Sequence, residues 1–219
     1  QIMQFYLKKA AAGDVKAQVT LASLYFEGKI VPRDNQQAVS WLIKAATAGD
    51  VKSQITLASV FFEGKIVPQD NQQAVIWLKA AGENGDKNSQ FLLATLYSDG
   101  VQVASDTAAA EYWYKKAAQQ GDAKAQYNLG LLLSAKDPAA AAAWYEKAAA
   151  QGLAQAHINL GVLFASGKGV PKDVVRAFGL FTRAAEQGDA DGQVKLGMAY
   201  LQGMGTNQDS KKALENFRA

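Results

Sequence analysis

A segment of 36 residues that begins at Gly13 is repeated closely from Gly49. Further copies begin at Gly85, Gly121, Gly152 and Gly188. The steps are 36 residues long, except for a step of 31 residues into the copy that begins at Gly152. A fixed period in this range is typical of a stack of similar units, each of which needs its neighbours to bury its apolar face.

The first half of each copy predicts a helix. Apolar residues from Ala17 to Tyr25 recur three and four positions apart, as on one side of an amphipathic helix. Asp14 precedes this segment and is placed to cap it, because a carboxylate accepts hydrogen bonds from the free N–H groups of a helix start. Gly28 follows the segment and is placed to end it.

The second half predicts another helix, which begins at Asp34. Asp34 and Gln37 have the spacing of a capping box, in which each side chain bonds the backbone N–H of the other residue. The helix is expected to end at Gly49, where the next copy begins. The fourth copy lacks five residues between Leu133 and Asp137, which shortens the loop between its two helices.

The predicted fold is therefore all-α: a right-handed α-solenoid superhelix of about six antiparallel helix pairs. We expect residues 1–219 to form a single solenoid. Its predicted units are residues 13–48, 49–84, 85–120, 121–151, 152–187 and 188–219, preceded by residues 2–12 as the second helix of a partial unit. Since neither end has an evident polar cap, the natural protein is expected to extend further or to have its ends covered.

Four positions recur in every copy and are interpreted as packing positions. The second helix has a small residue at Ala38, Ala74, Ala110, Ala141, Ala177 and Ala213. Three residues later stand Trp41, Trp77, Trp113, Trp144, Leu180 and Asn216. The first helix has Leu21, Leu57, Leu93, Leu129, Leu160 and Leu196, each followed by Ala or Gly. Recurrence of this kind indicates that every unit fills the same space in the same way.

Composition excludes several classes of function. The formal net charge is +3, and the basic residues are interspersed with acids, which argues against a nucleic-acid partner. Cysteine is absent, so disulfides, thiolate metal sites and cysteine nucleophiles are excluded. No apolar run approaches the ~20 residues of a membrane span. The chain begins with Gln1 and without a signal peptide, and we expect that an upstream segment was removed.

These residues resemble the Sel1-like repeat family, which is related to the tetratricopeptide repeat. In the first copy the family pattern follows Ala17, Leu21, Ala22, Tyr25, Gly28, Ile30, Val31, Asp34, Ala38, Trp41, Lys44, Ala45, Ala46 and Gly49. The resemblance implies a non-catalytic adaptor of the bacterial envelope, exported to the periplasm, that binds a protein or peptide; a cytoplasmic location stays open. Some similar proteins are immunity proteins that block antibacterial effectors such as phospholipases, so that alternative also stays open.

In related tetratricopeptide arrays the first helix of each unit lines the concave face, where a partner binds. On this helix the aromatic residues Phe26, Phe62, Phe91 and Tyr127 are candidate anchors. Asn128 and Asn159, with Lys124 and Lys195 nearby, form a candidate pocket for a peptide carboxylate. The alternatives are that the aromatic residues pack between helices and that the polar residues form an ordinary solvated surface.

Catalysis has weak support in the sequence. The single histidine, His157, stands where the other copies have Gln, which indicates a structural variant, and one histidine cannot form a triad or a zinc site without partners. The acids recur as helix caps. Gly167-Lys168-Gly169 keeps the repeat register and is a weak phosphate-loop signal. We therefore expect no catalytic residue, metal or cofactor, and a hydrolase is the least favoured alternative.

Overall fold

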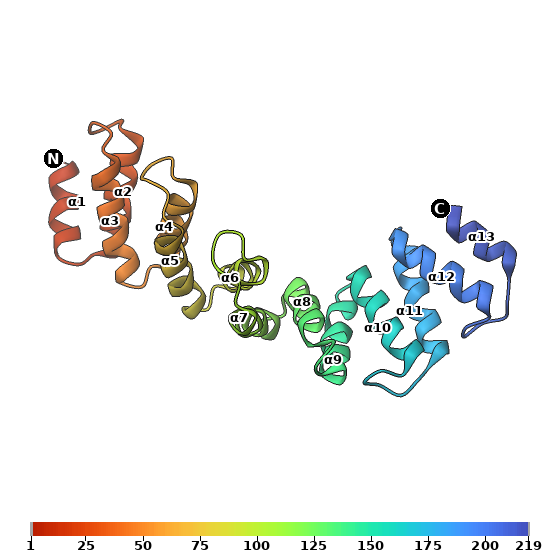
Figure 1. Cartoon of the computed structure of the whole chain (residues 1–219). Coiled ribbons are helices and arrows are strands. Elements are labelled where there is room, and N and C mark those ends of the chain that lie inside the picture. The colour runs from red at the N-terminus through yellow and green to blue at the C-terminus, as the bar shows by residue number, and fades with distance from the viewer. Residues whose placement is uncertain (1, 219) are drawn as a thin grey trace. The chain divides into compact units, whose positions relative to one another are not determined.

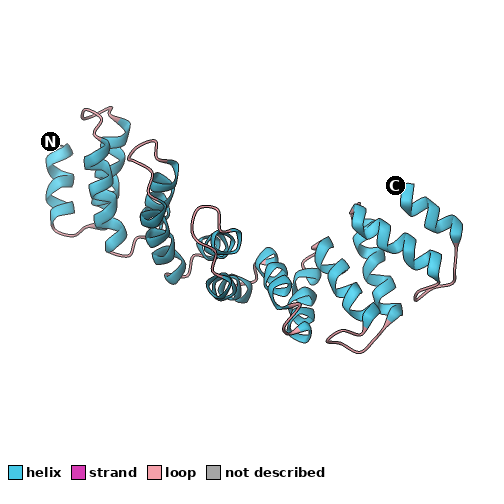
Figure 2. Ribbon diagram, viewed as in Figure 1, coloured by secondary structure: helices cyan, strands magenta, loops and turns pink. Residues whose placement is uncertain are grey.

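The computed structural model describes residues 2–218, which form thirteen helices and no strand (Figures 1 and 2). The helices are α1 (Ile2–Ala11), α2 (Val15–Glu27), α3 (Asn35–Thr47), α4 (Val51–Glu63), α5 (Asn71–Glu83), α6 (Lys87–Asp99), α7 (Thr107–Gln119), α8 (Ala123–Leu133), α9 (Pro138–Ala150), α10 (Ala154–Ser166), α11 (Val174–Glu186), α12 (Ala190–Gln202) and α13 (Ser210–Arg218). None of the helices in this range combines the length and the apolar character that crossing a membrane requires.

The chain divides after Trp113 into two compact units, here called the N-terminal and the C-terminal unit. In the N-terminal unit consecutive helices from α1 to α6 pack against each other, and so do consecutive helices from α8 to α13 in the C-terminal unit. Even-numbered helices are the first helices of the repeats, and the odd-numbered helices from α3 onward are the second helices. The prediction of an all-α fold built from consecutive helix pairs is thus confirmed.

The first helices begin and end where the repeat signals predict. Asp14 accepts a hydrogen bond through Oδ1 from the backbone N–H of Ala17, with an N···O distance of 2.9 Å. The same cap is formed by Asp50, Asp86, Asp122 and Asp189. Leu153 takes this position before α10 and provides no side-chain hydrogen bond. At the other end, Gly28 adopts a left-handed conformation at φ 68°, where its N–H bonds to the carbonyl of Leu24.

Only half of the predicted capping box forms at the second helices. Asp34 accepts from the backbone N–H of Gln37 at 3.0 Å, as expected. The backbone N–H of Asp34 does not take a Gln side chain, because it donates to the carbonyl of Tyr25 at 3.0 Å. The same bond joins Asp70 to the carbonyl of Phe61. This hydrogen bond connects the end of the loop to the first helix of the same repeat, and it therefore fixes where the second helix begins relative to the first.

In the core of the repeats, the size of the residue after the recurrent leucine depends on the residue that follows the tryptophan position. In α8, a Cβ atom added to Gly130 would lie 2.5 Å from Cε1 of Tyr145, and the ring therefore requires glycine there. Gly161 meets Phe181 in the same way, at 2.6 Å. Where the aromatic ring is replaced by leucine, the glycine is replaced by alanine, as with Ala22 and Leu42 or Ala58 and Leu78. The third repeat combines Ala94 with Tyr114 and does not follow this rule.

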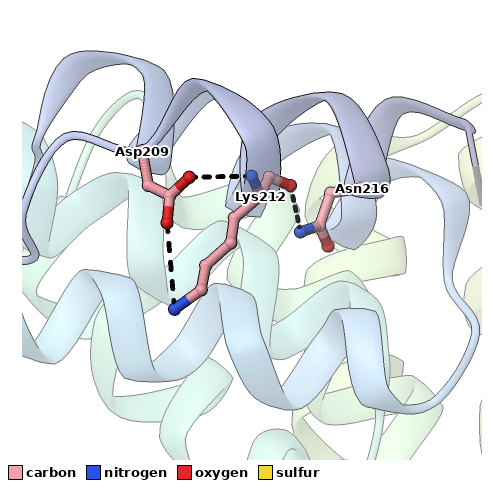
Figure 3. A network of polar contacts seen from close by, with 3 residues as sticks. All are labelled: Asp209, Lys212 and Asn216. Atoms are coloured by element: carbon pink, nitrogen blue, oxygen red, sulfur yellow. Dashed lines mark hydrogen bonds and ion pairs between the residues drawn. The ribbon is translucent and has the colours of Figure 1, made fainter.

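In the last repeat the position of the recurrent tryptophan is occupied by a polar residue, Asn216 on α13. Asn216 donates through Nδ2 to the carbonyl of Lys212 at 2.9 Å (Figure 3). Lys212 in turn donates its backbone N–H to Asp209 Oδ1 at 3.0 Å, and its ammonium lies 4.0 Å from the other carboxylate oxygen. The amide of Asn216 is therefore used within its own helix.

Candidate functional site

The candidate binding residues lie along the first helices. We call the first-helix face the surface formed by positions 19, 20, 23 and 26 of the first repeat and their equivalents. Phe26 is half-buried and packs against the core cluster of the N-terminal unit, which contains Leu21 and Trp41. Phe62 and Phe91 are also half-buried. These rings therefore offer a partner only part of their surface.

Two predicted site residues meet at one interior side chain of the C-terminal unit. The ring centroid of Tyr127 lies 5.9 Å from that of Tyr145, which is buried. The Asn159 side chain forms a hydrogen bond with the Tyr145 hydroxyl group. Burial raises the pKa of Tyr145 to about 12, with a small contribution from Tyr127, while the bond to Asn159 opposes this shift. Tyr127 and Asn159 thus help to hold α8, α9 and α10 together.

The remaining polar residues of the predicted carboxylate pocket lie on different first helices. Asn128 is half-buried on α8, and Lys195 is half-buried on α12. Within residues 2–218, no hydrogen bond joins either side chain to Asn159. Lys195 instead lines a shallow groove of about 300 Å³ together with Val162 and Met198. The use of these residues as a partner-binding pocket remains a prediction.

The first-helix face differs between the two units at position 23. In the C-terminal unit this position is occupied by exposed aliphatic side chains: Leu131 is 43% exposed, Val162 40% and Met198 42%. In the N-terminal unit the equivalents are Ser23, Ser59 and Thr95. Leu201 on α12 is also exposed on this face. Large apolar side chains repeated on one face are a feature of binding surfaces, whereas single exposed ones are ordinary. This difference is visible when the repeats are aligned, but it is missed if only aromatic residues are considered as binding anchors.

A second set of side chains links each first helix to the repeat before it. Gln18 donates through Nε2 to the carbonyl of Ala10 at 3.1 Å, and Gln54 donates to the carbonyl of Ala46 at 2.9 Å. Gln90 and Gln126 make the same bond to Gly82 and Ala118. All four glutamines are buried. Their recurrence is therefore explained by a hydrogen bond that connects neighbouring repeats.

His157 occupies the same buried position on α10 but bonds differently. Its Nδ1 lies 3.1 Å from the carbonyl oxygen of Leu153, and a carbonyl oxygen can only accept, so Nδ1 carries the proton. Burial lowers the pKa of His157 below its ordinary value of 6.5; the bond to Leu153 opposes this shift and the nearby Arg183 adds to it. The ring is therefore neutral at pH 7. Among residues 2–218 no group of three or more His, Cys, Asp or Glu side chains is placed to hold a metal ion.

Comparison with known proteins identifies the repeat. The family model described as Sel1 repeat matches residues 15–50, 51–86, 87–122, 123–153, 154–189 and 190–219. A search of curated proteins gave no match.

Solved structures with the same fold were found. A protective antigen present in uropathogenic Escherichia coli strains, described as having an SLR fold, is 32% identical with a TM-score of 0.73; the match covers 99% of this chain and 47% of the antigen. This chain thus spans about half the length of that protein. A Sel1 repeat protein from Oxalobacter formigenes is 28% identical with a TM-score of 0.63, covering 97% of this chain and 89% of its own.

An immunity protein from Pseudomonas aeruginosa is 20% identical with a TM-score of 0.47, over 93% of this chain and 80% of its own. A likeness at this level provides no basis for assigning a role to the present chain.

Proposed function

Because the chain belongs to the Sel1 repeat family, we propose that it is a non-catalytic adaptor that binds a protein or peptide partner on its first-helix face. The observation that supports this proposal is the row of Leu131, Val162 and Met198 in the C-terminal unit. An apolar row flanked by polar side chains fits the apolar face of a helix or an extended segment from another protein. We propose no catalytic residue.

The proposed surface includes both apolar and polar contacts. The groove beside Val162 and Met198 takes an apolar side chain of the partner, and Lys195 at its edge takes an acidic one. Tyr127 and Asn128 on α8 belong to the same surface of the C-terminal unit, and Phe62 and Phe91 have the corresponding positions on the first helices of the N-terminal unit. Since a few well-placed residues supply most of the binding energy of an interface, we expect the aliphatic row to contribute more than the half-buried rings.

The test replaces the aliphatic row by the residue that the first repeat has at the same position. The partner is first captured from the source organism with the wild-type chain and identified by mass spectrometry. The triple variant Leu131→Ser, Val162→Ser and Met198→Ser is expected to lose at least about 90% of that capture, because each large contact residue contributes on the order of 1 kcal/mol or more. Val175→Ser is the matched control, since Val175 is exposed on α11, outside the first-helix face.

Two results would change the proposal. Undiminished capture of the same partner by the triple variant would exclude the aliphatic row. A similar loss in a Phe26, Phe62 and Tyr127 triple alanine variant, with the aliphatic row intact, would move the site to the rings. If the captured partner is an enzyme that loses activity on binding, the adaptor is an immunity protein.

We also propose that the protein is exported to the periplasm, which rests on the family resemblance alone. Fractionation of the source organism, followed with an antibody to this chain, is expected to recover the protein with periplasmic marker enzymes. Recovery only with cytoplasmic markers would contradict export.

A further inference from the structure

A cleft of about 640 Å³ opens between the second helices α9 and α11, on the side of the C-terminal unit where α10 presents His157. Its apolar floor is formed by Ala149, Leu160 and Leu180. Glu146, Arg176 and Arg183 line its rim. The cleft does not include any residue of the first-helix face.

The equivalent space in the N-terminal unit is filled by a tryptophan ring. Trp113 is buried and packs so closely on Gly82 that a Cβ atom added there would lie 3.0 Å from Cζ3 of the ring. By the repeat register, Ala149 corresponds to Gly82 and Leu180 corresponds to Trp113. Because leucine is much smaller than tryptophan, the fifth repeat leaves this space open.

The exchange of tryptophan for leucine also frees a cation. In the first repeat the ammonium of Lys44 lies 3.8 Å from the ring centroid of Trp41, and Lys147 lies 4.1 Å from that of Trp144. Arg183 has the corresponding position in the fifth repeat, beside Leu180. Among the described residues it has neither a ring nor an ion-pair partner. Its guanidinium is therefore available to a ligand.

The cleft also contains a hydrogen-bond acceptor on His157. With Nδ1 bonded to Leu153, the Nε2 atom of His157 is an acceptor that has no hydrogen-bond partner within residues 2–218. Because His157 lines the cleft, this acceptor suits a ligand that supplies an N–H group.

The charged side chains at the rim of the cleft indicate which charged group the ligand carries. Arg176 forms an ion pair with Glu146 and lies over the ring of Phe164, at 4.1 Å from its centroid. These two opposite charges compensate each other, which leaves Arg183 as the uncompensated cation of the cleft. The planar fork of a guanidinium matches a carboxylate in geometry, and such pairs are stronger than neutral hydrogen bonds.

We propose that this cleft binds an acidic peptide segment, whose carboxylate is held by Arg183 and whose backbone N–H donates to Nε2 of His157. A peptide provides a carboxylate and N–H groups a few ångströms apart, which a simple anion does not. The cleft is separate from the first-helix face. If peptide binding in the cleft is disproved, the proposed adaptor function is therefore unaffected.

The test uses the fact that His157 is the only histidine of the chain, so its Hε1 proton gives a single resolved NMR signal once any purification tag has been removed. Three pentapeptides with a blocked N-terminus serve as probes: one with a central Glu and an amidated C-terminus, one of alanine with a free C-terminus, and one with a central Gln and an amidated C-terminus. The first two distinguish a side-chain carboxylate from a terminal one. We expect a saturable shift of the signal with at least one of them and none with the Gln peptide.

Two substitutions test the site itself. Leu180→Trp restores the tryptophan of the other repeats and fills the cleft without changing a charge, so it is expected to abolish the shift while the melting temperature stays the same or rises. Arg183→Gln is expected to weaken binding about tenfold or more, and Arg183→Lys, which keeps the charge but not the fork, less than that.

The proposal fails if neither carboxylate peptide shifts the signal at concentrations up to about 10 mM. It also fails if the Gln peptide binds equally well, or if a folded Leu180→Trp variant binds like the wild type. A thermal melt of each variant shows whether it is folded.

Discussion

The space between neighbouring second helices is built from the same repeat positions in both units but has different contents. In the N-terminal unit Trp113 covers Gly82, and Gln90 ties the two repeats together through the carbonyl of Gly82. In the C-terminal unit Leu180 leaves Ala149 open to a cleft, and His157 replaces the glutamine. Both departures occur in one repeat and at one place, although 23 residues separate them along the chain.

This difference shows how a repeat protein gains a specific site. The helix pairs and the buried leucine are retained in both units, so the scaffold does not depend on the tryptophan or the glutamine in every repeat. A position that is filled for stability in one repeat can be left open in another and become available for binding. The same holds on the first-helix face, where serine in the first two repeats is replaced by exposed aliphatic residues.

The largest effect is expected when the N-terminal space is opened. Trp113→Leu removes a buried ring from contact with Gly82 and should lower the free energy of unfolding by about 2–4 kcal/mol, measured by urea titration followed by circular dichroism. Val101→Ala is the control, because Val101 is 86% exposed and should change stability by less than about 0.5 kcal/mol. A loss of unfolding free energy below about 1 kcal/mol for Trp113→Leu would mean that the neighbouring second helices pack well without the tryptophan ring.

A smaller effect is expected from the coupled core positions of the C-terminal unit. Gly161→Ala places a Cβ atom against Phe181 and should cost about 1–3 kcal/mol, although alanine by itself favours a helix by about 1 kcal/mol. Adding Phe181→Leu recreates the Ala22 and Leu42 combination of the first repeat. We expect the double variant to be more stable than the sum of the single changes by at least about 0.5 kcal/mol, as a double-mutant cycle measures. Strict additivity would show that the two positions are independent.

Much of the fold could be predicted from the sequence because its signals are local and repeated. Asp14, Gly28 and Asp34 act within a few residues of their own position, and the structure confirms the helix ends that they predict. The reciprocal bond of Gln37 was wrongly predicted, because the backbone N–H of Asp34 donates to Tyr25, nine residues earlier.

The candidate sites were harder to predict because they depend on contacts between repeats. The role of Gln18 and its equivalents requires knowing that the carbonyl eight residues earlier lies within reach. The link between Tyr127, Tyr145 and Asn159 joins three helices. The sequence shows that, except in the third repeat, glycine accompanies an aromatic ring and alanine accompanies leucine at these two core positions. Only the packing of the ring on the glycine explains this pairing.

The one first helix without an acidic cap offers a test of the local signals. Leu153→Asp gives α10 the cap that the other first helices have and should be more stable than Leu153→Ala by about 1 kcal/mol. The comparison with alanine is the appropriate one, since both changes remove the packing of the Leu153 side chain against the cluster formed by Ala148, Ala149 and Ala156. Equal melting temperatures for the two variants would mean that the start of α10 is fixed by packing alone.

The smallest expected effect concerns the pH dependence of stability. Because burial lowers the pKa of His157, the unfolded chain takes up a proton at a higher pH than the folded chain does. The stability that depends on a neutral ring is therefore fully present above the unfolded pKa of about 6.5 and is lost as the pH falls below it. His157→Gln, which restores the repeat residue, lacks this loss. Urea titrations from about pH 7.5 to about pH 5.5 should show the wild type losing stability relative to the variant, and parallel curves would mean that the folded ring titrates at its ordinary pKa.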